Sequence, residues 1–149
     1  MMGEGNPKLL VQNRQRGVRL DMAWIRRFAR GALTACAGRF PKVGGTTGYV
    51  ELDEVVVTVV SDARIDRLHR EFMDIAGATD VITFEHGDIV VSADTAFREA
   101  QERGGTVEGE LGLYIVHGLL HLNGFDDRSD DSRQEMHAVQ DEVWRTIRV

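Results

Sequence analysis

Two histidines four residues apart, followed by a carboxylate six residues later, form the part of the sequence best suited to chemistry. These residues are His117, His121 and Asp127. Residues four apart on a helix share a face, with Cβ atoms about 5–6 Å apart, so both imidazoles can reach one ion. Zinc accepts His and carboxylate ligands, and a catalytic zinc uses three protein ligands. Because Gly124 permits a sharp turn after the helix, we predict one Zn²⁺ ion held by His117, His121 and Asp127.

The spacing also matches the zinc-protease pattern H-E-x-x-H-x-x-G-x-x-H at three of its four metal-frame positions, since Asp127 replaces the last His. In those proteases the Glu after the first His is the general base. Gly118 occupies that position here. The sequence therefore predicts a metal-binding frame without the peptidase base, and a zinc metallopeptidase-like hydrolase is the less favoured alternative.

The elements that position these residues follow from apolar periodicity and capping signals. We expect strands at about 9–12, 51–60, 81–84 and 88–91, and helices at 21–37, from 61 onward, 92–103, 106–122 and near the C-terminus. In the second helix Ile65, Leu68 and Phe72 are expected to face the core. The pattern predicts an α+β fold in a single domain, residues 1–149. A small mixed sheet of about four strands packs with about five helices, and the metal-binding helix lies near the C-terminal third.

Composition and charge restrict the function classes. Cys36 is the only cysteine, which excludes an internal disulfide and fits a cytoplasmic setting. The N-terminus has no apolar signal-peptide region, and the apolar run 111–122 is too short to span a membrane. Residues 1–50 hold nine Lys/Arg and two Asp/Glu, a net +7, whereas residues 51–149 hold nine and 22, a net −13.

The basic N-terminal third admits two interpretations. One is a face that contacts a polyanion, with Arg26, Arg27 and Arg30 opposite the apolar stripe of the first helix. The other is that the charges average out over the folded surface.

The segment 117–127, with Met136 nine residues later, resembles the signature of the YbeY family, as do residues 79–84 followed by 87–91. The resemblance covers roughly residues 50–145, and the N-terminal third matches only in general layout. It implies a zinc-dependent, single-strand-specific endoribonuclease that acts in rRNA processing, notably small-subunit rRNA 3′-end maturation, and in ribosome quality control. It further implies a cytoplasmic protein with single-stranded RNA and the small ribosomal subunit as partners. Neither a membrane nor DNA is an expected partner.

Two departures from the family pattern affect the expected site. The family usually has His where this chain has Asp127, and Asp126 also matches a family position, which makes it the alternative ligand. Met73 stands where many members carry an arginine that contacts RNA phosphate. Arg70, one turn earlier, is therefore our candidate to replace that arginine.

The sequence does not assign the general base to a single residue. Asp126 and Glu110 are the candidates, although a carboxylate near a helix N-terminus such as Glu110 is equally explained by the helix dipole. The predicted catalytic residues are thus Arg70, Asp126 and Glu110. A further alternative is a non-catalytic ribosome-assembly factor with a structural zinc.

Overall fold

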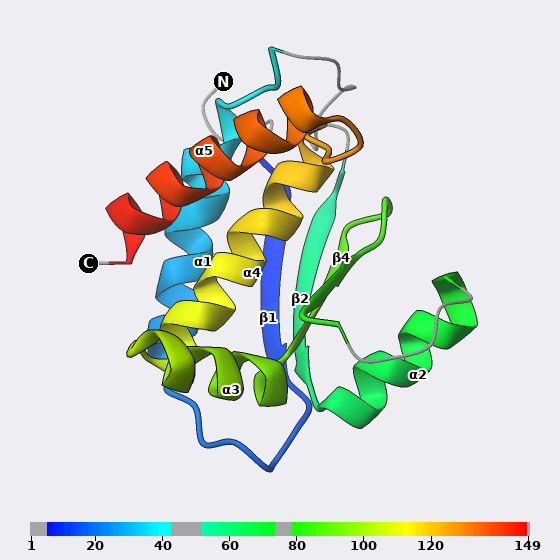
Figure 1. The fold of residues 1–149 in the computed structure, drawn as a ribbon, viewed down its shortest axis with the longest axis vertical. Helices are drawn as coiled ribbons and strands as arrows, with labels where there is room; N and C mark the ends of the chain where they lie inside the picture. The colour runs from blue at the N-terminus through cyan, green and yellow to red at the C-terminus, as the bar shows by residue number, and fades with distance from the viewer. Residues whose placement is uncertain (1–5, 43–51, 74–78, 149) are drawn as a thin grey trace.

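The computed structural model describes residues 6–42, 52–73 and 79–148, which form five helices and a four-stranded sheet (Figure 1). This confirms the predicted α+β class. The strand expected from residue 51 starts at Glu54 in the described part, and residue 51 itself lies outside it. In chain order the elements are β1 (Lys8–Asn13), α1 (Met22–Ala37), β2 (Glu54–Val60), α2 (Asp62–Met73), β3 (Val81–Thr83), β4 (Asp88–Ser92), α3 (Ala93–Arg103), α4 (Val107–Leu122) and α5 (Asp130–Ile147).

The sheet has the strand order β1-β2-β4-β3 and is mixed. β1, β2 and β4 run parallel, with Val57 of β2 aligned to Val11 of β1 and to Ile89 of β4. The short strand β3 pairs antiparallel with β4 and forms one edge. The valine-rich sequence of β2 suits its central place: Val55, Val57 and Val59 are fully buried, whereas Val56 and Thr58 on the other face are only partly buried.

Alternate side chains of the sheet enter two separate cores. Val57, Ile89 and their same-face neighbours pack with α1, α4 and α5 in the larger core. Ile82 and Val90 point the other way and pack with Ile65 of α2. As a result α4 and α2 lie on opposite faces of the sheet (Figure 1).

Side-chain caps fix where the helices begin, as the sequence predicted. Asp21 accepts a hydrogen bond from the Trp24 backbone N–H at 3.1 Å, and Ser92 accepts one from Thr95 at 3.2 Å. Thr106 caps α4, the helix that carries both histidines. Caps of this kind satisfy backbone donors that the first helical turn leaves free.

Two glycines bring α4 close to its neighbours. A Cβ on Gly112 would lie 2.9 Å from the Phe28 ring of α1, and one on Gly118 would lie 2.8 Å from Ile89 Cγ2 of β4. These close approaches fix how α4 is rotated about its own axis. They leave His117 and His121 on a different side of the helix, toward the β3 edge of the sheet.

The prediction that Phe72 belongs to the core is wrong, because the residue is 62% exposed. α2 packs against the sheet through the buried Ile65 and the partly buried Leu68, and it covers only the part of this face that Val60, Val90 and Ile82 provide. The last turn of α2 therefore presents Phe72 to solvent. Among the described helices, we find none that combines the length and apolar character needed to cross a bilayer.

Candidate metal centre

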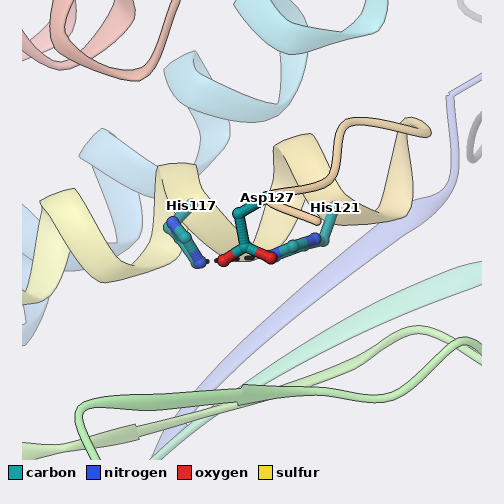
Figure 2. A group of neighbouring side chains, drawn as sticks. All are labelled: His117, His121 and Asp127. Atoms are coloured by element: carbon teal, nitrogen blue, oxygen red, sulfur yellow. Dashed lines mark hydrogen bonds between the residues drawn. The ribbon is translucent and has the colours of Figure 1, made fainter. Parts of the chain in front are cut away.

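His117 and His121 project from the same side of α4 and direct their Nε2 atoms toward each other. The two Nε2 atoms are 3.1 Å apart, and the ring centroids are 4.6 Å apart. The Asp127 carboxylate completes the group, with one ligand atom from each residue within 4.8 Å of the others. Figure 2 shows the two imidazoles and the carboxylate converging beside α4. The structure thus brings together all three predicted ligands.

The other nitrogen of each imidazole is held by an oxygen. His117 Nδ1 lies 2.7 Å from Gln140 Oε1 of α5, and His121 Nδ1 lies 3.0 Å from the backbone carbonyl oxygen of Phe125. A carbonyl oxygen only accepts hydrogen bonds, so each Nδ1 carries the proton and donates it. Each Nε2 then carries a lone pair, which is the form of imidazole that binds a metal.

Two lone pairs that face each other at 3.1 Å repel unless a cation lies between them. Two nitrogens bound to one tetrahedral zinc at about 2.0–2.1 Å lie about 3.3 Å apart. Burial, and then the neighbouring His117, lower the pKa of His121 below its ordinary value, so the ring is neutral at pH 7. The donor set therefore fits a divalent metal ion without rearrangement of the rings.

The chain reaches Asp127 through the turn that ends α4. Gly124 adopts a φ of 97°, a conformation open to glycine, and the next side chain, Phe125, is buried and anchors the turn. Asp127 then lies exposed beside the histidines. Asp126 is used differently, since its Oδ1 accepts a hydrogen bond from the Arg128 backbone at 3.1 Å. That bond, together with one from the Ser132 hydroxyl, lowers the pKa of Asp126.

A cavity of about 920 Å³ opens between the histidines and the edge strand β3, and we call it the metal cavity. A second cavity of about 700 Å³ meets it at His117 and Asp127. The charged residues that line the metal cavity, other than the histidines, are mostly acidic: Asp80, Glu85, Asp126, Asp127 and Arg128. A cation in this cavity would therefore be stabilised by its surroundings.

Gly118 stands where zinc peptidases carry their general base, but it faces away from the metal cavity. Its Cβ position points at the Ile89 side chain of β4, at 2.8 Å. A longer side chain would clash with Ile89, so the Ile89 side chain or α4 itself would have to shift. The site thus lacks both the peptidase base and the space for it.

A comparison with known protein families shows to which family this chain belongs. The model of the family described as Endoribonuclease YbeY matches residues 10–148. The chain belongs to the YbeY family. The family resemblance drawn from residues 50–145 is confirmed, and the match extends into the N-terminal third.

Relatives and a solved structure agree with the YbeY affiliation. The endoribonuclease YbeY of Pelotomaculum thermopropionicum is 33% identical over 150 residues, which covers 91% of this chain and 93% of that protein. A chloroplastic endoribonuclease YBEY of Arabidopsis thaliana is 36% identical over 113 residues, which covers 67% of this chain and 19% of that protein. The solution structure of TM1509 from Thermotoga maritima superimposes with a TM-score of 0.61 at 25% identity, covering 93% and 88% of the two chains.

The structure does not bring Glu110 of this YbeY chain to the metal cavity. Glu110 is 5% exposed, and its Oε1 accepts a hydrogen bond from Arg103 Nη1 of α3 at 3.1 Å. It lines neither of the two cavities that His117 lines. Burial, followed by the charge of Glu110, raises the pKa of Tyr114 well above its ordinary value. The contacts of Glu110 are therefore those of a residue that joins α3 to α4.

The arginines proposed from the sequence lie away from the same cavities. Arg70 belongs to α2, on the opposite sheet face, where it pairs with Asp66 at 3.3 Å. On α1, Arg26, Arg27 and Arg30 are exposed, and none of them lines the two cavities. The side chain of Met73 lies outside the described residues. A role for Arg70 stays a prediction that mutagenesis must test.

Gln140 is a site residue that the sequence analysis missed. It lies 23 positions after His117, on a different helix, and no local spacing links the two. The only available signal was that α5 must pack on α4 for the histidine face to be supported. Arg128, which lines the metal cavity beside Asp127, was also missed.

Proposed function

We propose that this chain is a zinc-dependent, single-strand-specific endoribonuclease that acts in small-subunit rRNA 3′-end maturation and in ribosome quality control. Membership of a family whose curated relatives are named endoribonucleases supports the reaction class. One observation carries the metal assignment: the lone pairs of His117 and His121 Nε2 meet at 3.1 Å beside Asp127. We propose these three residues as ligands of one Zn²⁺ ion.

Bound here, zinc would supply a Lewis acid and a water whose pKa is lowered to about 7. The chain supplies the orientation of the site. Gln140 and the Phe125 carbonyl hold the two imidazoles in the metal-binding tautomer, so no reorganisation is needed. Asp126 borders the metal cavity, which makes it our candidate for a carboxylate that orients a ligand or accepts a proton. Its lowered pKa makes it a weak base and so favours the orienting role.

We further propose a cytoplasmic protein that works beside the small ribosomal subunit. The single cysteine, Cys36, is buried, and burial raises its pKa to about 12. A thiol in that state is inert and suits a reducing compartment. The relative from Arabidopsis thaliana is described as chloroplastic.

The experiment that tests the proposal compares substrates and metal states. Purified protein is assayed for zinc, then incubated with a single-stranded RNA, the duplex of the same sequence, and casein, each with and without chelator. We expect cleavage of the single strand alone, loss of cleavage with chelator, and recovery on adding zinc. His117→Ala should lose zinc, whereas the matched control His137→Ala should keep it, because His137 does not belong to the ligand group.

Other outcomes would redirect the assignment. Cleavage of casein would favour the peptidase-like alternative, which Gly118 disfavours. Stoichiometric zinc without cleavage of any RNA would favour an assembly factor with a structural zinc. Arg70→Ala belongs in the same series, and unchanged RNA cleavage would remove Arg70 from the reaction.

A further inference from the structure

The sheet face opposite α4 is only partly covered, and a groove runs along its open part. The groove has a volume of about 620 Å³ and lies between α2 and strands β1, β2 and β4. Its floor is mixed rather than apolar, since Gln12 and Thr58 lie beside Val56. Gln12 donates a hydrogen bond to Thr58 at 3.1 Å, so these two strands present a row of polar groups.

Three aromatic rings gather at one end of this groove. Phe84 stacks on His86 with centroids 5.6 Å apart and planes at 21°, and Phe72 meets Phe84 edge-on at 5.4 Å. Phe72 is 62% exposed, and the His86 side chain is 69% exposed. Phe72 and His86 each contact the partly buried Phe84 while most of their own surface stays in solvent. Exposed ring faces of this kind are what nucleobases stack on.

Two residues that line the groove link it to the rings. Asp88 lines the groove and its carboxylate lies 2.6 Å from His86 Nε2. Leu68 also lines the groove, and it packs in the same small core as Phe84. We call this surface, defined by Arg14, Arg64, Phe72, Phe84 and His86, the aromatic groove.

The charge of the aromatic groove is the opposite of that in the metal cavity. Arg14 and Arg64 are exposed, line the groove, and make no ion pair within the described part of the chain. Asp88 is the one acidic residue among the described residues that line it. The metal cavity instead contains four carboxylates and one arginine. The adjoining cavity adds Arg98 and Arg103, but Arg98 pairs with Asp62, and Arg103 pairs with Glu99 and Glu110. The two arginines of the groove make no such pairs among the described residues, so the groove offers free cationic contacts to a polyanion.

The edge strand β3 and the turn after it border both surfaces. Val81, Thr83 and Glu85 line the metal cavity. The alternate residues Ile82 and Phe84 pack on the α2 side. β3 has β4 on one side and no partner strand on the other within the described residues. A single strand held in the groove can therefore pass around this free edge and enter the metal cavity.

We propose that the aromatic groove is the surface that binds single-stranded RNA. Bases stack on Phe72 and on the Phe84–His86 pair, and the phosphates contact Arg14 and Arg64. The inference rests on the proposed function and adds its substrate-binding surface. It also gives a physical reason for single-strand specificity, because paired bases cannot open onto a ring platform.

The test measures binding separately from cleavage. A short fluorescein-labelled oligouridylate is titrated into chelator-treated protein, and affinity is followed by anisotropy at several salt concentrations. Phe72→Ala combined with His86→Ala should weaken binding about 5- to 100-fold, the effect of losing one or two stacking partners. Arg14→Ala combined with Arg64→Ala should reduce the slope of log affinity against log salt by about 1.4, or about 0.7 for each phosphate contact.

Matched controls come from the same chain. Phe97→Ala removes a phenylalanine on α3 that is 45% exposed and lies outside the groove, and it should leave affinity unchanged. Replacing Arg26, Arg27 and Arg30 by Ala removes three exposed charges from α1 and should keep the salt slope. Phe72→Trp should retain affinity, and the oligouridylate should quench more tryptophan emission in this variant than in the wild type, which has Trp24 and Trp144. That difference does not depend on any loss of stability.

The outcomes separate this inference from the proposed function. Weakened binding by the groove variants supports the groove even if the wild type cleaves no RNA, in which case only the nuclease proposal fails. If the groove variants bind with wild-type affinity and slope, the groove inference is wrong, and cleavage by the wild type would leave the function intact. A salt slope that falls only in the α1 variant, or equal affinity for the duplex, also overturns it.

Discussion

Hydrogen-bond donors and acceptors decide the chemistry of His117 and His121. The Phe125 carbonyl and the Gln140 side-chain oxygen take the Nδ1 protons, at 3.0 Å and 2.7 Å respectively. Both Nε2 lone pairs are consequently directed at one point, beside a carboxylate that carries the charge zinc favours. The affinity for metal should therefore depend on the oxygen partners as well as on the ligands.

Removing the carboxylate should expose its role as the third ligand. We expect Asp127→Ala to lose most bound zinc, because two neutral imidazoles remain, and Asp127→His to retain it. The measurement is zinc content after dialysis against a weak chelator. Asp126→Ala is the adjacent control and should keep a full equivalent, since Asp126 is engaged by the Arg128 backbone. Zinc loss in Asp126→Ala but not in Asp127→Ala would move the assignment by one residue.

Gln140 should affect metal affinity without touching the metal. Gln140→Leu keeps the approximate side-chain volume but removes the acceptor for His117 Nδ1, so the imidazole loses its fixed tautomer. We expect metal affinity to fall about 10- to 100-fold, the usual cost of losing such a partner. Competition with a zinc-binding dye would measure it. Gln134→Leu, an exposed substitution on the same helix, should leave affinity unchanged, and equal losses in both variants would exclude the proposed role of Gln140.

At the scale of elements, the contact between α4 and β4 depends on a missing side chain. Gly118→Ala would place a Cβ 2.8 Å from Ile89 Cγ2, and Ile89 is fully buried in the central part of the sheet. We expect the free energy of unfolding to fall by about 1–3 kcal/mol, as overpacking usually costs. Urea denaturation measures the change. Adding Ile89→Val should recover part of it, and Gly105→Ala, whose Cβ meets nothing within 4 Å, should be neutral.

The start of α2 and the start of α3 are joined by the Asp62 carboxylate. Asp62 accepts hydrogen bonds from the hydroxyls of Ser92 at 2.5 Å and Thr95 at 2.8 Å, and pairs with Arg98 at 2.9 Å. Burial alone would raise the pKa of Asp62, but these hydroxyl and guanidinium donors outweigh it and lower the pKa. The stabilisation is thus fully present above the unfolded-state pKa of about 3.9 and is lost as pH falls through the lower folded-state value.

Asp62→Asn should therefore lower the free energy of unfolding at pH 7. In acid, where Asp62 is protonated in the wild type, the two proteins should be about equally stable. We expect a loss of about 1–2 kcal/mol in the free energy of unfolding at pH 7, because hydrogen bonds to a charged group are removed. The difference from wild type should shrink as pH falls below about 4. Asp141→Asn removes an exposed pair with Arg145 and should change stability little. A destabilisation that is independent of pH would show that the carboxylate charge is not what joins the helices.

For the whole molecule, local signals in the sequence predicted more than long-range ones. The caps at Asp21 and Thr106 and the turn at Gly124 depend on side chains within a few residues, and the structure has them where expected. For α3 the sequence left Ser92 and Asp94 as possible caps, and the structure has Ser92. The group His117, His121 and Asp127 could be predicted for the same reason, because its members lie close together in the sequence. The support from Gln140 and the exposure of Phe72 depend on how α5 and α2 dock, which periodicity does not encode.

The distribution of charge is also a property of the folded molecule. One of the two interpretations of the basic first third was a face that contacts a polyanion, yet the exposed arginines of α1 line neither cavity beside His117. Arg14 from that third and Arg64 from the acidic remainder come together in the aromatic groove instead. Only the topology of the sheet brings these two side chains to one face.

We propose that one metal ion at His117, His121 and Asp127 makes the whole molecule a nuclease for single-stranded RNA. The most direct measurement is the initial rate of cleavage of a single-stranded RNA as zinc is added stepwise to metal-free protein. We predict a rate that rises in proportion to bound zinc and saturates at one equivalent, with no cleavage in the Asp127→Ala variant at the same total zinc. Cleavage that is undiminished in metal-free protein, or no cleavage at full zinc occupancy, would show that this site is not the centre of a zinc-dependent nuclease.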